Sequence, residues 1–138
     1  MTLNFFKKLV LGIAGLTAFG IGATITTMPH MFYASYGITL GSEASLLSEL
    51  RAPGAGLAAL GVIMLLGIAR QRFAAVAILA SLTVFLSFPA GRLVSLILDG
   101  MPSKGILMAL VFECVIAALC LIAFVPKRCV QPNKTQSV

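Results

Sequence analysis

FAAVAILASLTVFLSFPAGRLVSLIL, the stretch from Phe73 to Leu98, decides the fold that the sequence predicts. As a helix this stretch would be about 39 Å long, enough to cross the roughly 30 Å hydrocarbon layer of a bilayer. It also carries Pro89 and Arg92 near its end. Because a charged side chain inside a membrane is costly, it usually faces a partner or a functional site in the protein interior. We therefore expect Arg92 to point inward.

The chain as a whole has the composition of a membrane protein. Of its 138 residues, 59% are hydrophobic and only 10% are charged, whereas about 25% charged residues is typical of a soluble domain. The formal net charge of +6 would favour a nucleic-acid partner in a soluble protein. Here most basic residues flank apolar runs, so we attribute the charge to topology and to anionic headgroups. We expect the lipid bilayer, not nucleic acid, as the partner.

Four apolar segments predict four membrane-spanning helices in a single domain that covers residues 1–138. The helices are expected at about 5–27, 49–69, 73–98 and 104–125, followed by a polar tail, 126–138. The basic turn at 70–72 is so short that the helices on either side of it must be antiparallel neighbours. The predicted fold is all-α: a polytopic membrane protein built as an antiparallel four-transmembrane-helix bundle.

The first apolar segment has an alternative interpretation as a cleavable signal peptide, because two lysines precede it. We favour a retained helix, since its apolar part is longer than usual for a signal peptide and no typical cleavage site follows. Small residues form a stripe on this helix and another on the second helix. Such stripes allow close helix packing in lipid. They comprise Gly12, Gly15, Ala18 and Gly22 in the first helix and Gly54, Ala55 and Ala58 in the second.

The distribution of lysine and arginine predicts the orientation in the membrane. Cytoplasmic loops carry an excess of these residues, and the four-helix topology separates them unequally. One side would carry Lys7, Lys8, Arg70, Arg72, Lys127, Arg128 and Lys134, and the other side Arg51, Arg92 and Lys104. Both termini are therefore expected in the cytoplasm.

Two charged residues are expected at similar depth on neighbouring helices. Arg92 would lie about 9 Å and Glu113 about 12 Å below the outer boundary of the membrane, which makes an ion pair between them feasible. Glu113 shares its helix face with Ile106, Ala109, Ala117 and Cys120, while the opposite face is purely apolar. Other polar residues lie slightly higher on the same side of the membrane. The complete candidate cluster is Glu49, Arg51, Arg92, Ser95, Asp99 and Glu113.

Two interpretations of this cluster compete. Pairing alone would relieve the cost of charge in lipid and hold the helices in register, and we favour this structural role over chemistry. Alternatively, the two arginines would recognise an anionic group such as a phosphate or carboxylate, which a guanidinium binds with two hydrogen bonds.

The sequence contains no recognisable catalytic set. There is no Ser/His/Asp combination, phosphate-binding loop or metal-ligand spacing, and His30 is the sole histidine. The three cysteines form no CxxC motif or Cys/His cluster. We therefore expect no catalytic residues, no metal and no cofactor, and we lean against an enzyme.

The spaced polar motifs resemble those of a known family. They are Glu49-Leu50-Arg51-Ala52 before a glycine-rich helix, Gly91-Arg92-Leu93-Val94-Ser95 with Asp99-Gly100, and Glu113. Together they resemble the small bacterial membrane proteins called domain of unknown function 4345, over roughly residues 14–123. The resemblance implies four membrane helices, a bacterial inner-membrane location and matching polar positions at Glu49, Arg51, Arg92, Asp99 and Glu113. It implies no established activity.

Three functions remain open at this point. The leading one is a non-enzymatic membrane protein. It would be either an accessory subunit or a protein that binds a small anionic or amphipathic ligand, or a lipid headgroup, in a charged pocket in the outer half of the bundle. The second is a proton-coupled transporter or membrane enzyme that uses Glu113 and Arg92. The third is an assembly subunit, either self-associating or joined to a larger membrane complex, and it rests on the stripes of small residues.

Overall fold

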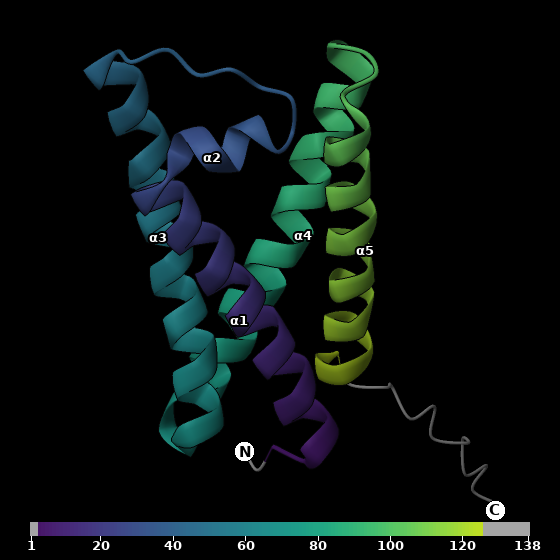
Figure 1. Ribbon diagram of the computed structural model, residues 1–138. Helices are drawn as coiled ribbons and strands as arrows, with labels where there is room; N and C mark the ends of the chain where they lie inside the picture. The colour runs from purple at the N-terminus through teal and green to yellow at the C-terminus, as the bar shows by residue number, and fades with distance from the viewer. Residues whose placement is uncertain (1–2, 126–138) are drawn as a thin grey trace, which may run out of the picture.

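The computed structural model describes residues 3–125, and within that range it contains helices and no strands (Figure 1). Four of the helices are long and apolar enough to cross a membrane, which confirms the predicted all-α, four-helix fold. The elements are α1 (Phe5–Thr27), α2 (Pro29–Ala34), α3 (Ala44–Ala69), the 3₁₀ turn η1 (Gln71–Phe73), α4 (Ala74–Leu98) and α5 (Lys104–Phe124). The predicted tail, 126–138, lies outside the described residues.

The largest differences from the predicted boundaries occur between α1 and α3. The connection contains the short helix α2, with Pro29 at its first turn, where the missing N–H of proline costs little. Helix α3 begins at Ala44 rather than near Glu49, so Pro53 lies within the helix and not in its first turn. The residues before it, ASLLSEL, are mostly good helix formers, which explains the earlier start. Helix α4 likewise runs through Pro89.

Helices α1 and α3 pack against each other through their glycines. A Cβ atom added to Gly22 would overlap the backbone nitrogen of Ala58, and one added to Gly61 would overlap the backbone nitrogen of Phe19. A Cβ on Gly54 would lie 2.7 Å from the Ile25 side chain. Only glycine permits such a close approach of two backbones. The predicted stripes of small residues therefore face one another inside this molecule.

The apolar core is concentrated near one end of the bundle. Within α4 the buried residues lie mainly in the first half, and within α5 they lie mainly in the second half. No residue of α4 beyond Pro89 is buried, and none of α5 before Glu113. Figure 1 shows the corresponding divergence: α1 and α3 lean away from the far end of α4 and the start of α5. Helices α3 and α5 do not contact each other.

A segment at the diverging end bridges the two halves of the molecule. Residues 35–43 run from α2 to the start of α3, and they contact the turn between α4 and α5. The Ser103 hydroxyl donates a hydrogen bond to the backbone oxygen of Tyr36, with an oxygen–oxygen distance of 2.8 Å. Gly37 and Gly100 adopt positive φ values of 77° and 90°, which glycine tolerates best, so both turns depend on them.

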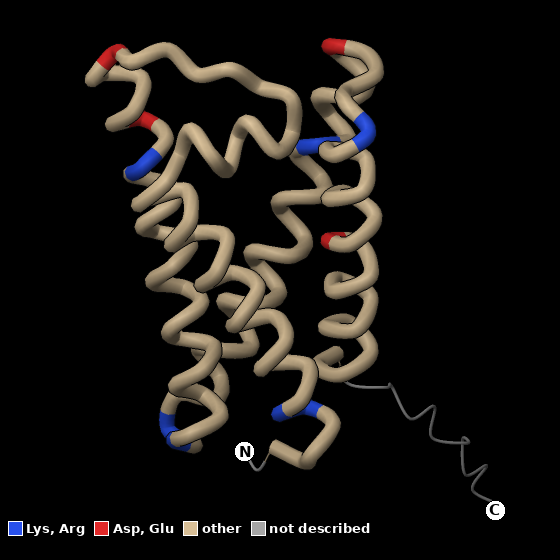
Figure 2. Tube along the Cα trace, viewed as in Figure 1, with Lys and Arg blue, Asp and Glu red and all other residues tan. Residues whose placement is uncertain are grey.

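Charged residues distinguish the two ends of the bundle (Figure 2). Among the described residues, the end that holds the start of α1 and η1 carries lysine and arginine: Lys7, Lys8, Arg70 and Arg72. The other end carries residues of both signs, and one acidic position lies partway along α5. The three basic residues that the orientation argument takes from the tail lie outside the described range.

Candidate ligand-binding cavity

A cavity of about 570 Å³ lies between the diverging halves of the molecule. Its walls come from α1, α2, the 35–43 segment, α4 and α5, with a single contribution, Leu57, from α3. Most of the lining side chains are aliphatic or aromatic. Cavities with an apolar lining and a few placed polar groups are typical of sites for small organic ligands.

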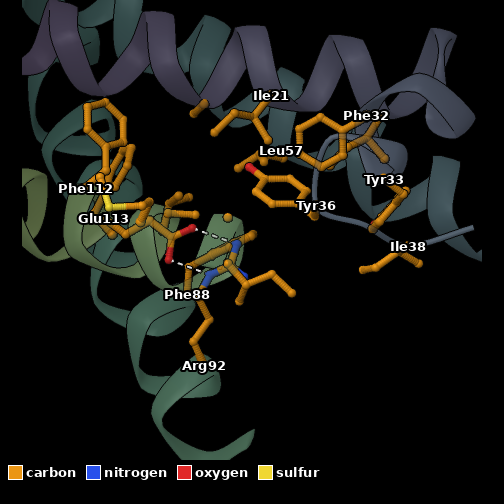
Figure 3. Close-up of a pocket in the computed structure, with 18 residues that line it drawn as sticks. Ile21, Phe32, Tyr33, Tyr36, Ile38, Leu57, Phe88, Arg92, Phe112 and Glu113 are labelled. Atoms are coloured by element: carbon orange, nitrogen blue, oxygen red, sulfur yellow. Dashed lines mark hydrogen bonds and ion pairs between the residues drawn. The ribbon is translucent and has the colours of Figure 1, made fainter. Parts of the chain in front are cut away.

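Arg92 and Glu113 form the main polar feature of the cavity wall (Figure 3). The Nε atom of Arg92 donates to Oε2 of Glu113 at 2.9 Å, and its Nη2 atom donates to Oε1 at 3.0 Å. This two-bond geometry matches the planar guanidinium fork to both carboxylate oxygens. The structure therefore places the two residues in direct contact across α4 and α5.

The two partners differ in exposure. The side chain of Glu113 is 7% exposed, whereas that of Arg92 is 28% exposed. A guanidinium has five N–H donors, and the pair with Glu113 accounts for two of them. No buried side-chain nitrogen or oxygen in the described part of the chain lacks a hydrogen-bond partner. The Nη1 atom of Arg92, which makes no hydrogen bond to the described residues, is therefore not buried, and Arg92 lines the cavity.

Aromatic side chains form the wall opposite the ion pair. Figure 3 shows Phe32, Tyr33 and Tyr36 on the far side of the cavity from Glu113. The Phe32 ring packs edge-on against Tyr33 and Tyr36, with centroid distances of 5.3 and 5.2 Å. Such edge-to-face pairs are favourable arrangements for aromatic rings. The aromatic cluster joins α2 to the 35–43 segment on this side of the cavity.

The remaining residues of the predicted cluster do not line this cavity. Ser95 lies on the next turn of α4 after Arg92, and Asp99 directly follows the helix. The Ser95 hydroxyl donates to Oδ2 of Asp99 at 2.8 Å at an exposed position. Arg51 borders a separate groove formed by α3 and the end of α1, together with Thr26 and Ser48. Glu49 is exposed and lines neither space.

The prediction of one cluster differs from the structure for a physical reason. Position along each helix sets the depth of a residue in the membrane, and the prediction rests on this depth. Lateral position depends on how the helices pack. Because α3 packs on α1 through glycines and does not contact α5, Arg51 lies away from Glu113.

The sequence prediction misses the part of the cavity wall that comes from the connection after α1. Tyr33 and Tyr36 lie outside the four predicted helices, and both line the cavity. Pro29 followed by three aromatic residues within a few positions is the signal for a short packed helix.

Within residues 3–125, no group of three or more His, Cys, Asp or Glu side chains is placed to hold a metal ion.

Comparison with known proteins identifies the family. No curated protein and no solved structure matches this chain. The family described as Domain of unknown function (DUF4345) matches residues 6–124, a range that covers all four long helices, the aromatic connection and the Arg92–Glu113 pair. With its four apolar helices, the chain is a helical membrane protein that belongs to the DUF4345 family.

Proposed function

We propose that this protein is a non-enzymatic membrane protein that binds a small amphipathic ligand in the cavity between its diverging halves. The observation that carries the proposal is the combination of an apolar space of about 570 Å³ with one partly exposed guanidinium on its wall. An amphipathic molecule has the same two features, an apolar body and a polar group.

The arrangement of the core supports a binding role over a purely structural one. If Arg92 and Glu113 served only to hold the helices together, close packing around the pair would be expected, because interiors contain few voids larger than a water molecule. Instead, the pair borders an open space of about 570 Å³. Its arginine retains N–H groups that Glu113 does not use.

The proposal includes a membrane location and an orientation. We place the protein in a bacterial inner membrane, with the start of α1 and η1 on the cytoplasmic side. The basic residues at that end and the mixed charges at the other end support this orientation. The cavity then lies in the outer leaflet.

A variant that fills the cavity tests the proposal. Ala109 lines the cavity on α5, so Ala109→Phe would place a ring in the space and leave the ion pair intact. The matched control is Val111→Phe on the same helix, where the native side chain is 58% exposed. Each protein is purified in mild detergent, and its bound lipids are extracted and identified by mass spectrometry.

We expect wild type and Val111→Phe to retain the same ligand. Ala109→Phe should retain about tenfold less, because its ring would occupy space that the ligand fills. Overfilling costs about 1–3 kcal/mol, and a tenfold change in affinity corresponds to about 1.4 kcal/mol. Helical circular dichroism must be equal for all three proteins. Equal ligand content in wild type and Ala109→Phe would refute a binding role for this cavity.

A further inference from the structure

The wall that holds Arg92 narrows the chemistry of the ligand. We propose that the cavity takes a neutral amphiphile with a single apolar chain and a carbonyl-type hydrogen-bond acceptor, such as a fatty ester or amide, and not an anionic lipid. This inference rests on the proposed function, because it concerns the same cavity.

The first argument is the charge of the wall. Among the described residues that line the cavity, Arg92 carries the positive charge and Glu113 the negative charge. Because they are joined by two hydrogen bonds, their charges compensate each other. An anionic headgroup would be attracted by the guanidinium and repelled by the carboxylate next to it, and it would also lose its hydration. Arg51, the second guanidinium expected for an anion, borders the other groove.

The second argument is the type of hydrogen bond that the wall offers. After its bonds to Glu113, Arg92 has N–H donors left and has no acceptor to offer. A ligand group that complements it must therefore accept hydrogen bonds. A neutral carbonyl oxygen does so and adds no charge to a wall that is already balanced.

The third argument is depth. Arg92 lies six residues before Leu98, the last residue of α4, which is about 9 Å along the helix axis. An ionised headgroup at this depth would lose its contact with water, which costs much free energy. Moving a neutral carbonyl group to the same depth costs much less. The wall of the cavity is also mainly aromatic and aliphatic, with Tyr33, Tyr36 and Ile106 among its residues.

The size of the cavity favours one apolar chain. If a methylene takes about the 30 Å³ of a water molecule, a space of about 570 Å³ holds roughly 19 such groups. This is the size of one fatty chain with a small head. A phospholipid with two chains would leave most of its body outside.

Three probes with the same chain length test the inference on the full-length protein. They are tritium-labelled methyl palmitate, palmitate and hexadecane, and their saturable binding is measured in neutral detergent at a pH where palmitate is ionised. The ester should bind about tenfold more tightly than hexadecane, which is the value of one hydrogen bond to a charged donor. Palmitate should bind more weakly than the ester.

Two variants test whether the Arg92–Glu113 pair causes the tighter binding of the ester. In the Arg92→Leu/Glu113→Leu double variant, the advantage of the ester over hexadecane should disappear, while hexadecane binding is kept. In Arg51→Leu, all three affinities should match those of wild type, because Arg51 borders a different groove.

The binding measurements on the wild-type protein test the inference even if a variant fails to fold. Palmitate binding as tightly as the ester would indicate an anion site, which overturns this inference and leaves the proposed function standing. Equal affinity for ester and hexadecane would mean that Arg92 does not contact the ligand, and it would also overturn the inference. No saturable binding of any probe would overturn the inference and the proposed function together.

Discussion

Removing one partner of the Arg92–Glu113 pair should destabilise the protein far more than removing both. A buried ion pair gains little over apolar residues of similar size, but a single partner left without its counterpart is costly, typically about 3–5 kcal/mol. Because the Glu113 side chain is 7% exposed and that of Arg92 is 28% exposed, the two single replacements should differ in how much unfolding free energy they cost.

Arg92→Leu leaves the buried carboxylate of Glu113 without its two hydrogen bonds, and we expect a loss of about 3 kcal/mol in the free energy of unfolding. Glu113→Leu leaves a guanidinium that is already partly open to the cavity, so about 1.5 kcal/mol is expected, half the lower bound for a fully buried partner. The double Leu variant should lie within about 1 kcal/mol of wild type, because the apolar side chains replace a neutral pair.

The assay is unfolding in mixed micelles by increasing denaturing detergent, followed by far-ultraviolet circular dichroism. Wild type, both single variants, the double variant and Arg51→Leu are compared. Arg51 is exposed and is outside the cavity, so its replacement should change stability by at most about 0.5 kcal/mol. The interaction energy from the double-mutant cycle should be at least about 2 kcal/mol. Additive losses in the double variant would refute the pairing, and a larger loss for Glu113→Leu than for Arg92→Leu would refute the argument from exposure.

Two further predictions concern packing and ligand exchange. Gly61→Ala should cost at least about 3 kcal/mol of unfolding free energy in the same assay, because its Cβ would overlap the α1 backbone. Gly56→Ala is the control: no atom lies within 4 Å of the added Cβ, so the free energy of unfolding should change by at most about 1 kcal/mol. Similar losses for both variants would argue against the α1–α3 contact. Ser103→Ala removes the hydrogen bond to Tyr36 and should speed dissociation of labelled methyl palmitate up to about fivefold, the equivalent of 1 kcal/mol. Ser95→Ala is the control, because the Ser95 hydroxyl bonds to Asp99 at the end of α4 and not to the 35–43 segment. An unchanged dissociation rate of methyl palmitate from Ser103→Ala would mean that the 35–43 segment does not limit ligand exchange.

The sequence predicts the fold well because a bilayer leaves few alternatives. Backbone polar groups in lipid must be paired within helices, so apolar length alone identifies the four spans. Depth is also predictable, since each residue adds a fixed rise along the helix. For this reason the sequence places Arg92 and Glu113 at one level, and the division of α5 into two faces correctly predicts that Glu113 points inward.

The cavity is beyond prediction because it depends on lateral packing. Which helix touches which is decided by side-chain fit, and hydropathy carries no information about it. The glycines of α1 and α3 are recognisable as contact surfaces, but the sequence does not say that they contact each other. Since the two stripes are used within one molecule, they no longer support the idea that they recruit another subunit. Arg51 follows α3 away from α5 for the same reason.

The close contact between α1 and α3 also limits how the molecule can change shape. Two backbones in contact have no flexible side chains between them to absorb sliding or rotation, so these helices should behave as a single stiff unit. The part that can swing is the far portion of α4 and α5, where nothing beyond Pro89 or before Glu113 is buried. The buried core around Val10, Leu11 and Ala14 of α1 would act as the pivot, and a small rotation there would widen or narrow the space beside Arg92.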